Sequence, residues 1–120
     1  MQRPRLLLAD DHQEVLDRVS SQLGEEFEIV ARLLDGQAAL DAALALKPDA
    51  VVFDISMPRM SGLEAASRLS DLPNPPRIVF LTVHEDQDFR DAATSAGASG
   101  YVLKRNMCRD LAAALRRALA

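Results

Sequence analysis

Short apolar runs alternate along the chain with longer segments in which apolar residues recur every three or four positions. A short continuous apolar run is typical of a strand buried on both faces, and the longer period is typical of an amphipathic helix. The runs predict five strands, at residues 6–9, 28–33, 50–53, 78–81 and 101–103. The periodic segments predict five helices, with apolar positions at residues 15–23, 40–44, 63–69, 89–96 and 107–119.

Glycine and proline separate these segments. The pair Asp35-Gly36 predicts a turn after the second strand, Pro48 ends the second helix, and Gly97 ends the fourth. Strands that alternate with helices predict βαβ units, and therefore one parallel sheet covered by helices on both faces. We predict a single-domain, doubly wound α/β fold with five strands and five helices.

The composition is that of one globular domain. Its 120 residues are enough for one hydrophobic core and too few for two, with 48% hydrophobic and 27% charged residues. The net charge of −4 argues against a nucleic-acid-binding surface on this segment, because such surfaces carry a basic excess. The single cysteine, Cys108, cannot form an internal disulfide, and we expect it to be buried in the last helix. Without a signal-peptide pattern or a bilayer-length apolar run, we expect a cytoplasmic protein and no membrane partner.

Polar residues follow or end four of the predicted strands. Asp10 and Asp11 follow the first strand, Asp54 the third, Thr82 the fourth and Lys104 the fifth. The carboxyl ends of parallel strands meet at one edge of the sheet, which is where α/β folds bind ligands. Each position alone is best explained as an ordinary strand end or helix cap. Together they form three carboxylates whose mutual repulsion and burial require a cation, and hard oxygen ligands favour Mg²⁺.

These residue types are suited to phosphoryl transfer. An ionised Asp54 can attack phosphorus and form an acyl phosphate, and the transfer then needs mainly positioning and charge neutralisation. Lys104 is one of only two lysines among 14 basic residues, and a compact ammonium suits a point contact to a phosphoryl oxygen. The hydroxyl of Thr82 could donate a hydrogen bond to a new phosphoryl oxygen.

Four segments of the chain, residues 8–12, 54–62, 81–86 and 96–104, resemble the receiver domains of bacterial two-component response regulators. The resemblance covers nearly the whole chain, and the last two segments are most similar to the NarL/FixJ (LuxR-type) subfamily. It implies a flavodoxin-like fold with the strand order 2-1-3-4-5. Members of this subfamily usually continue into a helix-turn-helix DNA-binding domain. We therefore expect residues 1–120 to be the N-terminal receiver domain of a longer regulator, and a stand-alone receiver is the alternative.

The resemblance also implies roles for individual residues. Asp54 would be the phosphoacceptor, and the metal ligands would be Asp10, Asp11, Asp54 and the backbone carbonyl of Ser56. Thr82 and Lys104 would contact the phosphoryl group, and the switch pair would be Thr82 and Tyr101.

Four positions close to the predicted site residues in the sequence need separate comment. Ser56 and His84 lie two residues after Asp54 and Thr82. The resemblance implies that these places flank the path of water to the phosphoryl group. His84 is equally well explained as a solvated loop residue, and we expect His12 to be a helix-surface residue rather than a ligand. Arg105 stands where many receivers have a proline preceded by a cis bond, and without proline such a bond costs about 3 kcal/mol.

The predicted function is that of a phosphorylation-controlled switch. A sensor histidine kinase would be the phosphodonor, phosphorylation could promote a homodimer, and DNA would be bound only through the attached domain. We expect no enzyme activity beyond the domain's own phosphorylation and dephosphorylation, because a phosphohydrolase would carry Asp where Ser56 stands. A degenerate receiver is disfavoured because the set of Asp10, Asp11, Asp54, Thr82 and Lys104 is complete.

Overall fold

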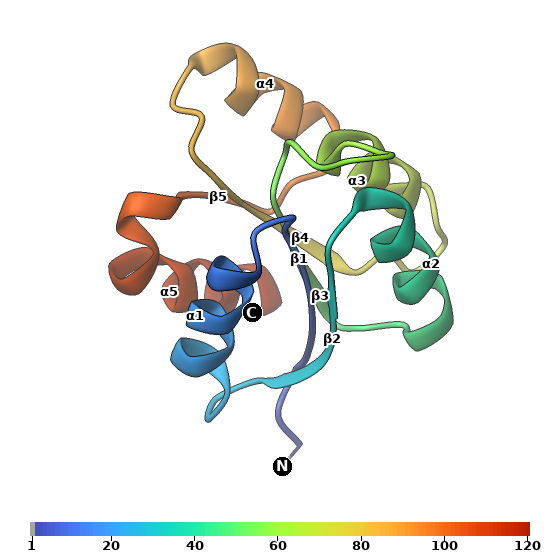
Figure 1. Cartoon of the computed structure of the whole chain (residues 1–120). Helices are drawn as coiled ribbons and strands as arrows, with labels where there is room; N and C mark the ends of the chain where they lie inside the picture. The colour runs from blue at the N-terminus through green and yellow to red at the C-terminus, as the bar shows by residue number, and fades with distance from the viewer. Residues whose placement is uncertain (1) are drawn as a thin grey trace.

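Five parallel strands form one sheet in the order β2-β1-β3-β4-β5 in the computed structural model, which describes residues 2–120 (Figure 1). The strands are β1 (Arg5–Ala9), β2 (Glu28–Leu33), β3 (Ala50–Phe53), β4 (Arg77–Thr82) and β5 (Gly100–Leu103). The helices are α1 (Gln13–Leu23), α2 (Gly36–Leu46), α3 (Gly62–Ser70), α4 (Gln87–Ser95) and α5 (Met107–Leu119), with a short 3-10 turn, η1 (Lys104–Asn106), before α5. The predicted fold class, the number of strands and helices, and the strand order are confirmed.

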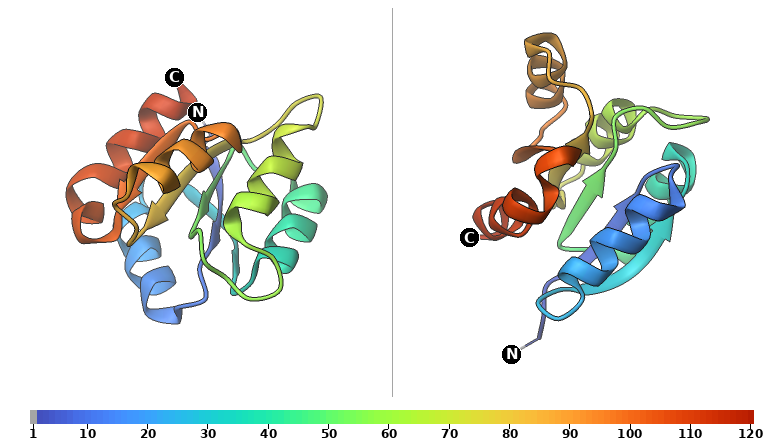
Figure 2. Two further views of the ribbon diagram at one scale, coloured as in Figure 1. Left: turned by 90° about the horizontal axis from the view of Figure 1, so that it is seen from above. Right: turned by 60° about the vertical axis from the view of Figure 1, so that its left-hand side comes forward.

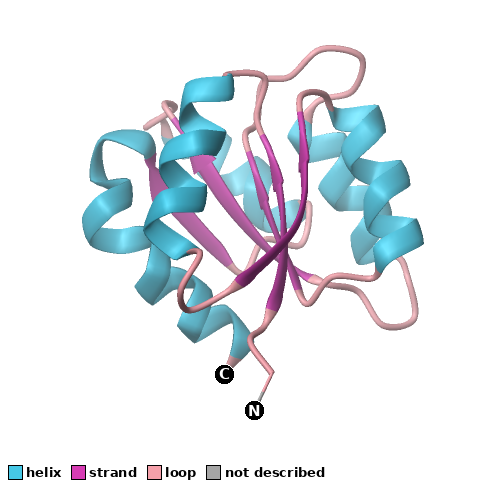
Figure 3. Ribbon diagram, turned by 60° about the horizontal axis from the view of Figure 1, so that its bottom comes forward, coloured by secondary structure: helices cyan, strands magenta, loops and turns pink. Residues whose placement is uncertain are grey.

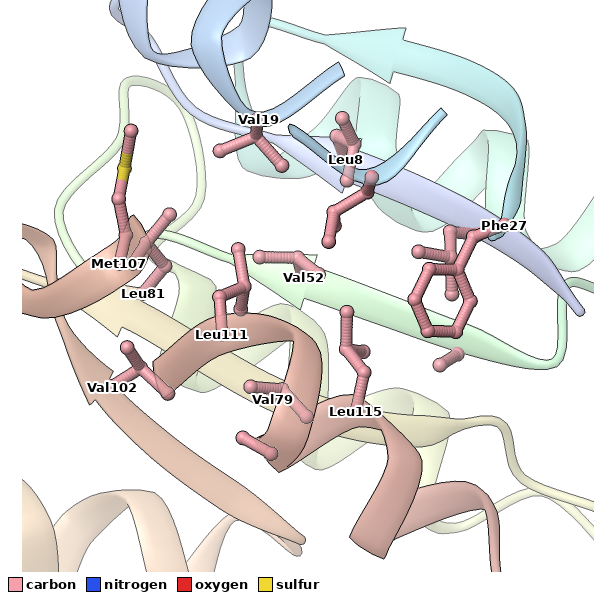
Figure 4. Packing of buried hydrophobic residues seen from close by; sticks show 14 of the residues in the cluster. Leu8, Val19, Phe27, Val52, Val79, Leu81, Val102, Met107, Leu111 and Leu115 are labelled. Atoms are coloured by element: carbon pink, nitrogen blue, oxygen red, sulfur yellow. The ribbon is translucent and has the colours of Figure 1, made fainter. Parts of the chain in front are cut away.

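The helices cover both faces of the sheet, so that the core has two layers (Figure 3). Side chains alternate between the faces along each strand. Leu6 and Leu8 of β1 therefore pack against α1 and α5, in the cluster shown in Figure 4. Leu7 and Ala9 of the same strand pack on the opposite face, where α2 and α3 lie side by side (Figure 2) and α4 completes the layer. Both faces being buried explains why the strands are continuous apolar runs.

The reversal of strand order places the ends of β1 and β3 next to each other. Ala9 pairs with Phe53 at the end of the ladder, and the amide of Asp54 donates to the carbonyl of Ala9 at 2.9 Å. The residues that follow, Asp10 and Asp54, therefore emerge together at the carboxyl edge. The chain leaves β1 toward one face, where α1 lies, and leaves β3 toward the other, where α3 lies. This divergence opens the edge of the sheet at that point.

A close backbone approach fixes the loop between β3 and α3. The amide of Gly62 donates to the carbonyl of Ile55 at 2.7 Å, and a Cβ atom on Gly62 would lie 1.9 Å from the carbonyl oxygen of Asp54. Only glycine allows α3 to begin this close to the strand end. Ser61 caps the helix by accepting from the amide of Glu64 at 3.1 Å. Both contacts hold the loop that follows Asp54.

Some predicted boundaries differ from the structure. Thr82 is the last residue of β4 rather than the residue after it, because it still pairs with Leu103. Gly36 begins α2 instead of forming a separate turn, because the side chain of Asp35 accepts from the amide of Ala38 at 2.8 Å and caps the helix. Gly97, with φ of 95°, lies two residues beyond the end of α4.

Two predictions of burial were wrong. Leu44, one of the apolar positions that predicted the second helix, is 46% exposed, because the buried stripe of α2 is made by Ala39, Leu40 and Ala43. Cys108 is also exposed. It follows Met107, whose side chain is buried against the sheet, and the helical period of α5 continues that buried stripe at Leu111 rather than at Cys108.

Candidate functional site

An acidic cluster lies at the carboxyl edge of the sheet, between the ends of β1 and β3. Asp10 is 3% exposed and Asp54 is 5% exposed, whereas Asp11 faces solvent. Ligand atoms of these three carboxylates and of His12 all lie within 4.8 Å of one another. The structure therefore brings together the three carboxylates that the sequence placed at one edge.

Lys104 supplies a positive charge to this cluster from the end of β5. Its Nζ donates to Asp54 Oδ2 at 3.2 Å and lies 2.8 Å from Asp10 Oδ2. Burial alone would lower the pKa of Lys104, but its contacts with Asp10 and Asp54 outweigh burial, so the pKa lies above its ordinary value. Lys104 is therefore charged at neutral pH. One ammonium still leaves three carboxylates with a net negative charge.

The charge of Asp54 is costly in this environment. Burial of the side chain and then the nearby charge of Asp10 raise the pKa of Asp54 above its ordinary value of 3.8, against the opposing effect of Lys104. The neighbouring Asp10 Oδ2 is also buried, and its partner is the ammonium of Lys104 at 2.8 Å, which Asp10 shares with Asp54. Both observations describe a site that would be relieved by an additional cation.

The two predicted switch residues contact the backbone of one residue, His84. Thr82 is fully buried at the end of β4, and its Oγ1 accepts from the amide of His84 at 3.2 Å. Tyr101, half-buried on β5, donates its hydroxyl to the carbonyl of His84 at 2.8 Å. The guanidinium of Arg90 on α4 lies over the Tyr101 ring, 4.6 Å from its centroid. The loop after β4 therefore joins Thr82 to Tyr101.

The side chain of His84 lies against the loop that follows Asp54. Its Nε2 is 3.2 Å from Ser56 Oγ, and its ring stacks on Phe89 of α4 with a centroid distance of 3.9 Å. The two residues predicted to border the water path are thus in direct contact. The stacking partner Phe89 was not predicted from the sequence, because a ring five residues further along gives no periodic signal of contact with His84.

His12 lies at the N-cap of α1, at the surface. Its side chain is 66% exposed, as expected for a helix-surface residue, but its ring turns toward the acidic cluster. Nδ1 lies 3.1 Å from Asp10 Oδ1 and 3.1 Å from Asp11 Oδ1.

The peptide bond between Lys104 and Arg105 is trans, and Arg105 forms an ion pair with Glu85 at 2.5 Å beside the site.

A small hollow adjoins the cluster between the loops after β4 and β5. Its volume is about 220 Å³, and it is lined by Thr82, Val83, Glu85, Leu103, Lys104 and Arg105. A larger hollow of about 500 Å³ lies at the opposite edge of the sheet, between residues 43–49 and residues 72–76. None of the predicted site residues lines the larger hollow, so its size does not connect it with the chemistry at the carboxyl edge.

The comparison with known families agrees with this site. The response regulator receiver domain model matches residues 6–116. The chain therefore belongs to the receiver domains of two-component response regulators, which are signalling modules. Receiver domains bind Mg²⁺ at an acidic pocket, and this chain carries an acidic cluster at the corresponding edge of the sheet.

Similar proteins include transcriptional regulators. The chain is 36% identical over 115 residues to the uncharacterized transcriptional regulatory protein YvfU of Bacillus subtilis, covering 94% of this chain and 58% of that protein. It is 35% identical to the oxygen regulatory protein NreC of Staphylococcus epidermidis, covering 93% of this chain and 53% of that protein. The chain thus spans about half the length of these relatives.

Among solved structures, the receiver domain of the putative response regulator NarL from Mycobacterium tuberculosis aligns with a TM-score of 0.91 at 27% identity, covering 98% of both chains. A LuxR-family response regulator from Aurantimonas sp. aligns with a TM-score of 0.91 at 30% identity, covering 98% of this chain and 86% of the other. The predicted resemblance to NarL- and LuxR-type receivers is confirmed. No helix within residues 2–120 is long and apolar enough to cross a membrane.

Proposed function

We propose that this receiver domain accepts a phosphoryl group on Asp54 in a Mg²⁺-dependent reaction and changes its binding surface in response. The observation that carries this proposal is the position of Asp54. It is buried at a strand end, 3.2 Å from the ammonium of Lys104, with Asp10 and Asp11 beside it. This arrangement offers a carboxylate nucleophile together with the groups that neutralise a phosphoryl dianion.

The residues around Asp54 fit a hard divalent cation. The raised pKa of Asp54 and the sharing of one ammonium by the buried carboxylates of Asp10 and Asp54 both indicate uncompensated negative charge. We assign the metal to Asp10, Asp11, Asp54 and the backbone carbonyl of Ser56, which are oxygen ligands of the kind that Mg²⁺ prefers. When bound, the ion supplies charge neutralisation for the phosphoryl oxygens.

The proposed transfer is a displacement at phosphorus. A carboxylate oxygen of Asp54 forms the new O–P bond, and the P–N bond to the histidine of a sensor kinase breaks with its electron pair staying on that nitrogen. Lys104 is already within reach of Asp54 and contacts the phosphoryl oxygens as they arrive. Asp54 must be ionised for this attack, which Lys104 and the metal favour.

The switch would operate through Thr82 and Tyr101. Thr82 Oγ1 accepts a hydrogen bond from His84, so its own hydroxyl hydrogen is free to be donated to a phosphoryl oxygen. Movement of Thr82 would displace the His84 backbone, to which Tyr101 is also bonded. The phosphoryl group thereby biases a pre-existing equilibrium at the surface formed by α4, β5 and α5.

The output and partners follow from the family. Receiver domains typically interact with histidine kinases, and the transcriptional relatives are nearly twice the length of this chain. We propose a sensor histidine kinase as the phosphodonor, a phosphorylation-dependent homodimer, and DNA binding only through a further helix-turn-helix domain. A stand-alone receiver that acts through protein contacts is the alternative. The cytoplasmic location stays a prediction.

Incubation with acetyl phosphate, with and without Mg²⁺, followed by intact-mass measurement tests the proposal. We expect one phosphoryl adduct that forms only with Mg²⁺ and stays on the protein long enough to be detected by mass. Rapid turnover of the donor with no adduct that accumulates would instead indicate a phosphohydrolase, although Ser56 occupies the position where such an enzyme would carry Asp. An unchanged mass would identify a domain that only binds partners.

A further inference from the structure

His12 stands at the N-cap position of α1 without capping it. Its backbone is extended, with φ of −104° and ψ of 109°, and its side chain makes no hydrogen bond to the helix. Cap positions favour short polar side chains that accept from the first amides of the helix. The imidazole instead turns toward Asp10 and Asp11 while remaining 66% exposed. The ring is therefore accessible from solvent and directed at the acidic cluster.

The distances within this group match the spacing of ligands around one ion. His12 Nδ1 lies 3.1 Å from Asp10 Oδ1 and 3.1 Å from Asp11 Oδ1. Adjacent ligands of an octahedral ion with bonds of about 2.1 Å are about 3.0 Å apart. Each of the two nitrogen–oxygen distances is therefore close to the spacing of adjacent ligands around one ion.

The nitrogen atom changes which cations the cluster suits. Carboxylates, carbonyls and water favour Mg²⁺, whereas imidazole suits ions such as Ni²⁺ and Zn²⁺, and affinity for a nitrogen-containing site rises from Mn²⁺ to Ni²⁺. An imidazole nitrogen therefore adds little for Mg²⁺ and considerably more for Ni²⁺. For ligation the ring must be neutral with its hydrogen on Nε2, which leaves a lone pair on Nδ1.

We propose that His12 Nδ1 is a metal ligand of this pocket and makes it selective for borderline divalent cations over Mg²⁺. The proposal rests on the acidic metal pocket assigned above and adds a specificity-determining residue to it. A purely structural alternative is that His12 only donates its N–H to the carboxylates and keeps them in place. In that case its removal changes the affinity for every divalent cation in the same direction.

Calorimetric titration of untagged protein with Ni²⁺ and with Mg²⁺ separates the two roles. A Cys108→Ser background removes the exposed thiol, which is another ligand for Ni²⁺. We expect His12→Asn to weaken Ni²⁺ binding by at least about tenfold, the loss typical even of an outer partner of a metal site. We expect the affinity for Mg²⁺ to change by no more than about twofold, because that ion keeps its oxygen ligands. Equal effects on both ions, or no effect on Ni²⁺, would overturn the proposal.

Matched variants locate the ion. His84→Asn removes the other histidine of the chain and should leave Ni²⁺ affinity unchanged, whereas Asp11→Asn should weaken both ions. In proton NMR of the Ni²⁺ form, a coordinated imidazole gives an exchangeable N–H signal shifted far from the diamagnetic range. We expect that signal in the wild type and in His84→Asn, and its loss in His12→Asn. Its persistence in His12→Asn would assign the nitrogen ligand elsewhere and overturn the proposal.

Failure of this inference can be told apart from failure of the proposed function. If acetyl phosphate leaves the mass unchanged but Ni²⁺ affinity depends on His12, the metal selectivity stands and the phosphoacceptor assignment fails. If Asp54 is phosphorylated with Mg²⁺ and Ni²⁺ binds equally well without His12, only the selectivity fails.

Discussion

Two aspartates flank the strand β3 and experience opposite surroundings. Asp49 immediately precedes the strand, is exposed, and accepts a hydrogen bond from the amide of Arg5 at 2.7 Å. Asp54 immediately follows the strand, is 5% exposed, and lies beside Asp10 and Lys104. Asp49 joins two neighbouring strands at the amino edge, where solvent supports its charge. Asp54 keeps a charge that the fold makes unfavourable, and such a carboxylate is a candidate for function.

The difference follows from the direction of a parallel sheet. At the amino edge, Arg5 bonds the carbonyls of Leu46 and Lys47 with its side chain and Asp49 with its amide, so these polar groups are paired locally. At the carboxyl edge the loops diverge toward opposite faces of the sheet, and the side chains at the strand ends contact one another.

Asp54→Asn should abolish phosphoryl acceptance from acetyl phosphate, because an amide is not a usable nucleophile. Asp49→Asn should be phosphorylated at the wild-type rate, since Asp49 lies at the other end of the strand. Intact mass over time measures both variants. If Asp54→Asn gained a phosphoryl group at the wild-type rate, the assignment of the phosphoacceptor would be wrong.

Mg²⁺ should raise the melting temperature of the wild type through binding to the folded state. At a concentration one hundred times the dissociation constant the stabilisation is about 2.7 kcal/mol. Asp11→Asn and Asp54→Asn should lose this response, whereas Asp49→Asn should keep it. A wild-type melting curve that does not respond to Mg²⁺ would contradict an acidic metal pocket.

Without metal, Asp54→Asn should be more stable than the wild type at pH 7, because the substitution removes a charge that burial and Asp10 disfavour. The pKa of Asp54 is raised in the folded state, so its contribution to stability is favourable at low pH and is lost as pH rises through that pKa. Each kcal/mol corresponds to roughly 4 °C in Tm for a domain of this size.

The stabilising effect of Asp54→Asn should therefore shrink as the pH is lowered. Asp49→Asn is the matched control and should lower Tm slightly, since it weakens the hydrogen bond with Arg5. Thermal unfolding at several pH values in the presence of chelator gives both comparisons. A destabilised Asp54→Asn protein at pH 7 would show that Lys104 more than compensates the charge of Asp54.

Phosphorylation should promote self-association through the surface formed by α4, β5 and α5. In this structure the guanidinium of Arg90 covers the ring of Tyr101, so movement of Tyr101 changes a contact between α4 and β5. Sedimentation velocity with and without a beryllofluoride phosphoryl mimic measures the association. Identical sedimentation in both states would contradict a phosphorylation-dependent dimer. It would not test the conformational change at Thr82 and Tyr101.

The smallest effect is expected at His84. Its Nε2 contacts Ser56 and its ring is stacked on Phe89, so the side chain is held as a cover beside the site. No carboxylate contacts its ring among the described residues, and orientation for base catalysis usually requires such a partner. His84→Ala should therefore shorten the phosphoryl lifetime modestly, and wild-type decay should depend little on pH near neutrality. A clear lengthening, or decay that follows a histidine titration, would assign His84 to assisting the water.

The sequence by itself determined the sheet, the helices and the edge at which the polar residues gather. Periodicity reports burial along one segment, and the parallel order of the strands then places every strand end on the same edge. The sequence alone therefore groups the polar residues Asp10, Asp11, Asp54, Thr82 and Lys104. In the structure, the three carboxylates and Lys104 lie together.

Only the tertiary structure decided how side chains from different loops meet. The contact of Ser56 with His84, the stacking of His84 on Phe89 and the turn of the His12 ring depend on rotamers and loop paths that periodicity does not encode. The raised pKa of Asp54 likewise depends on its burial and its distance from Asp10, residues 44 positions apart in the sequence. Local patterns predict what a segment buries, whereas distances between segments emerge only once the whole core has packed.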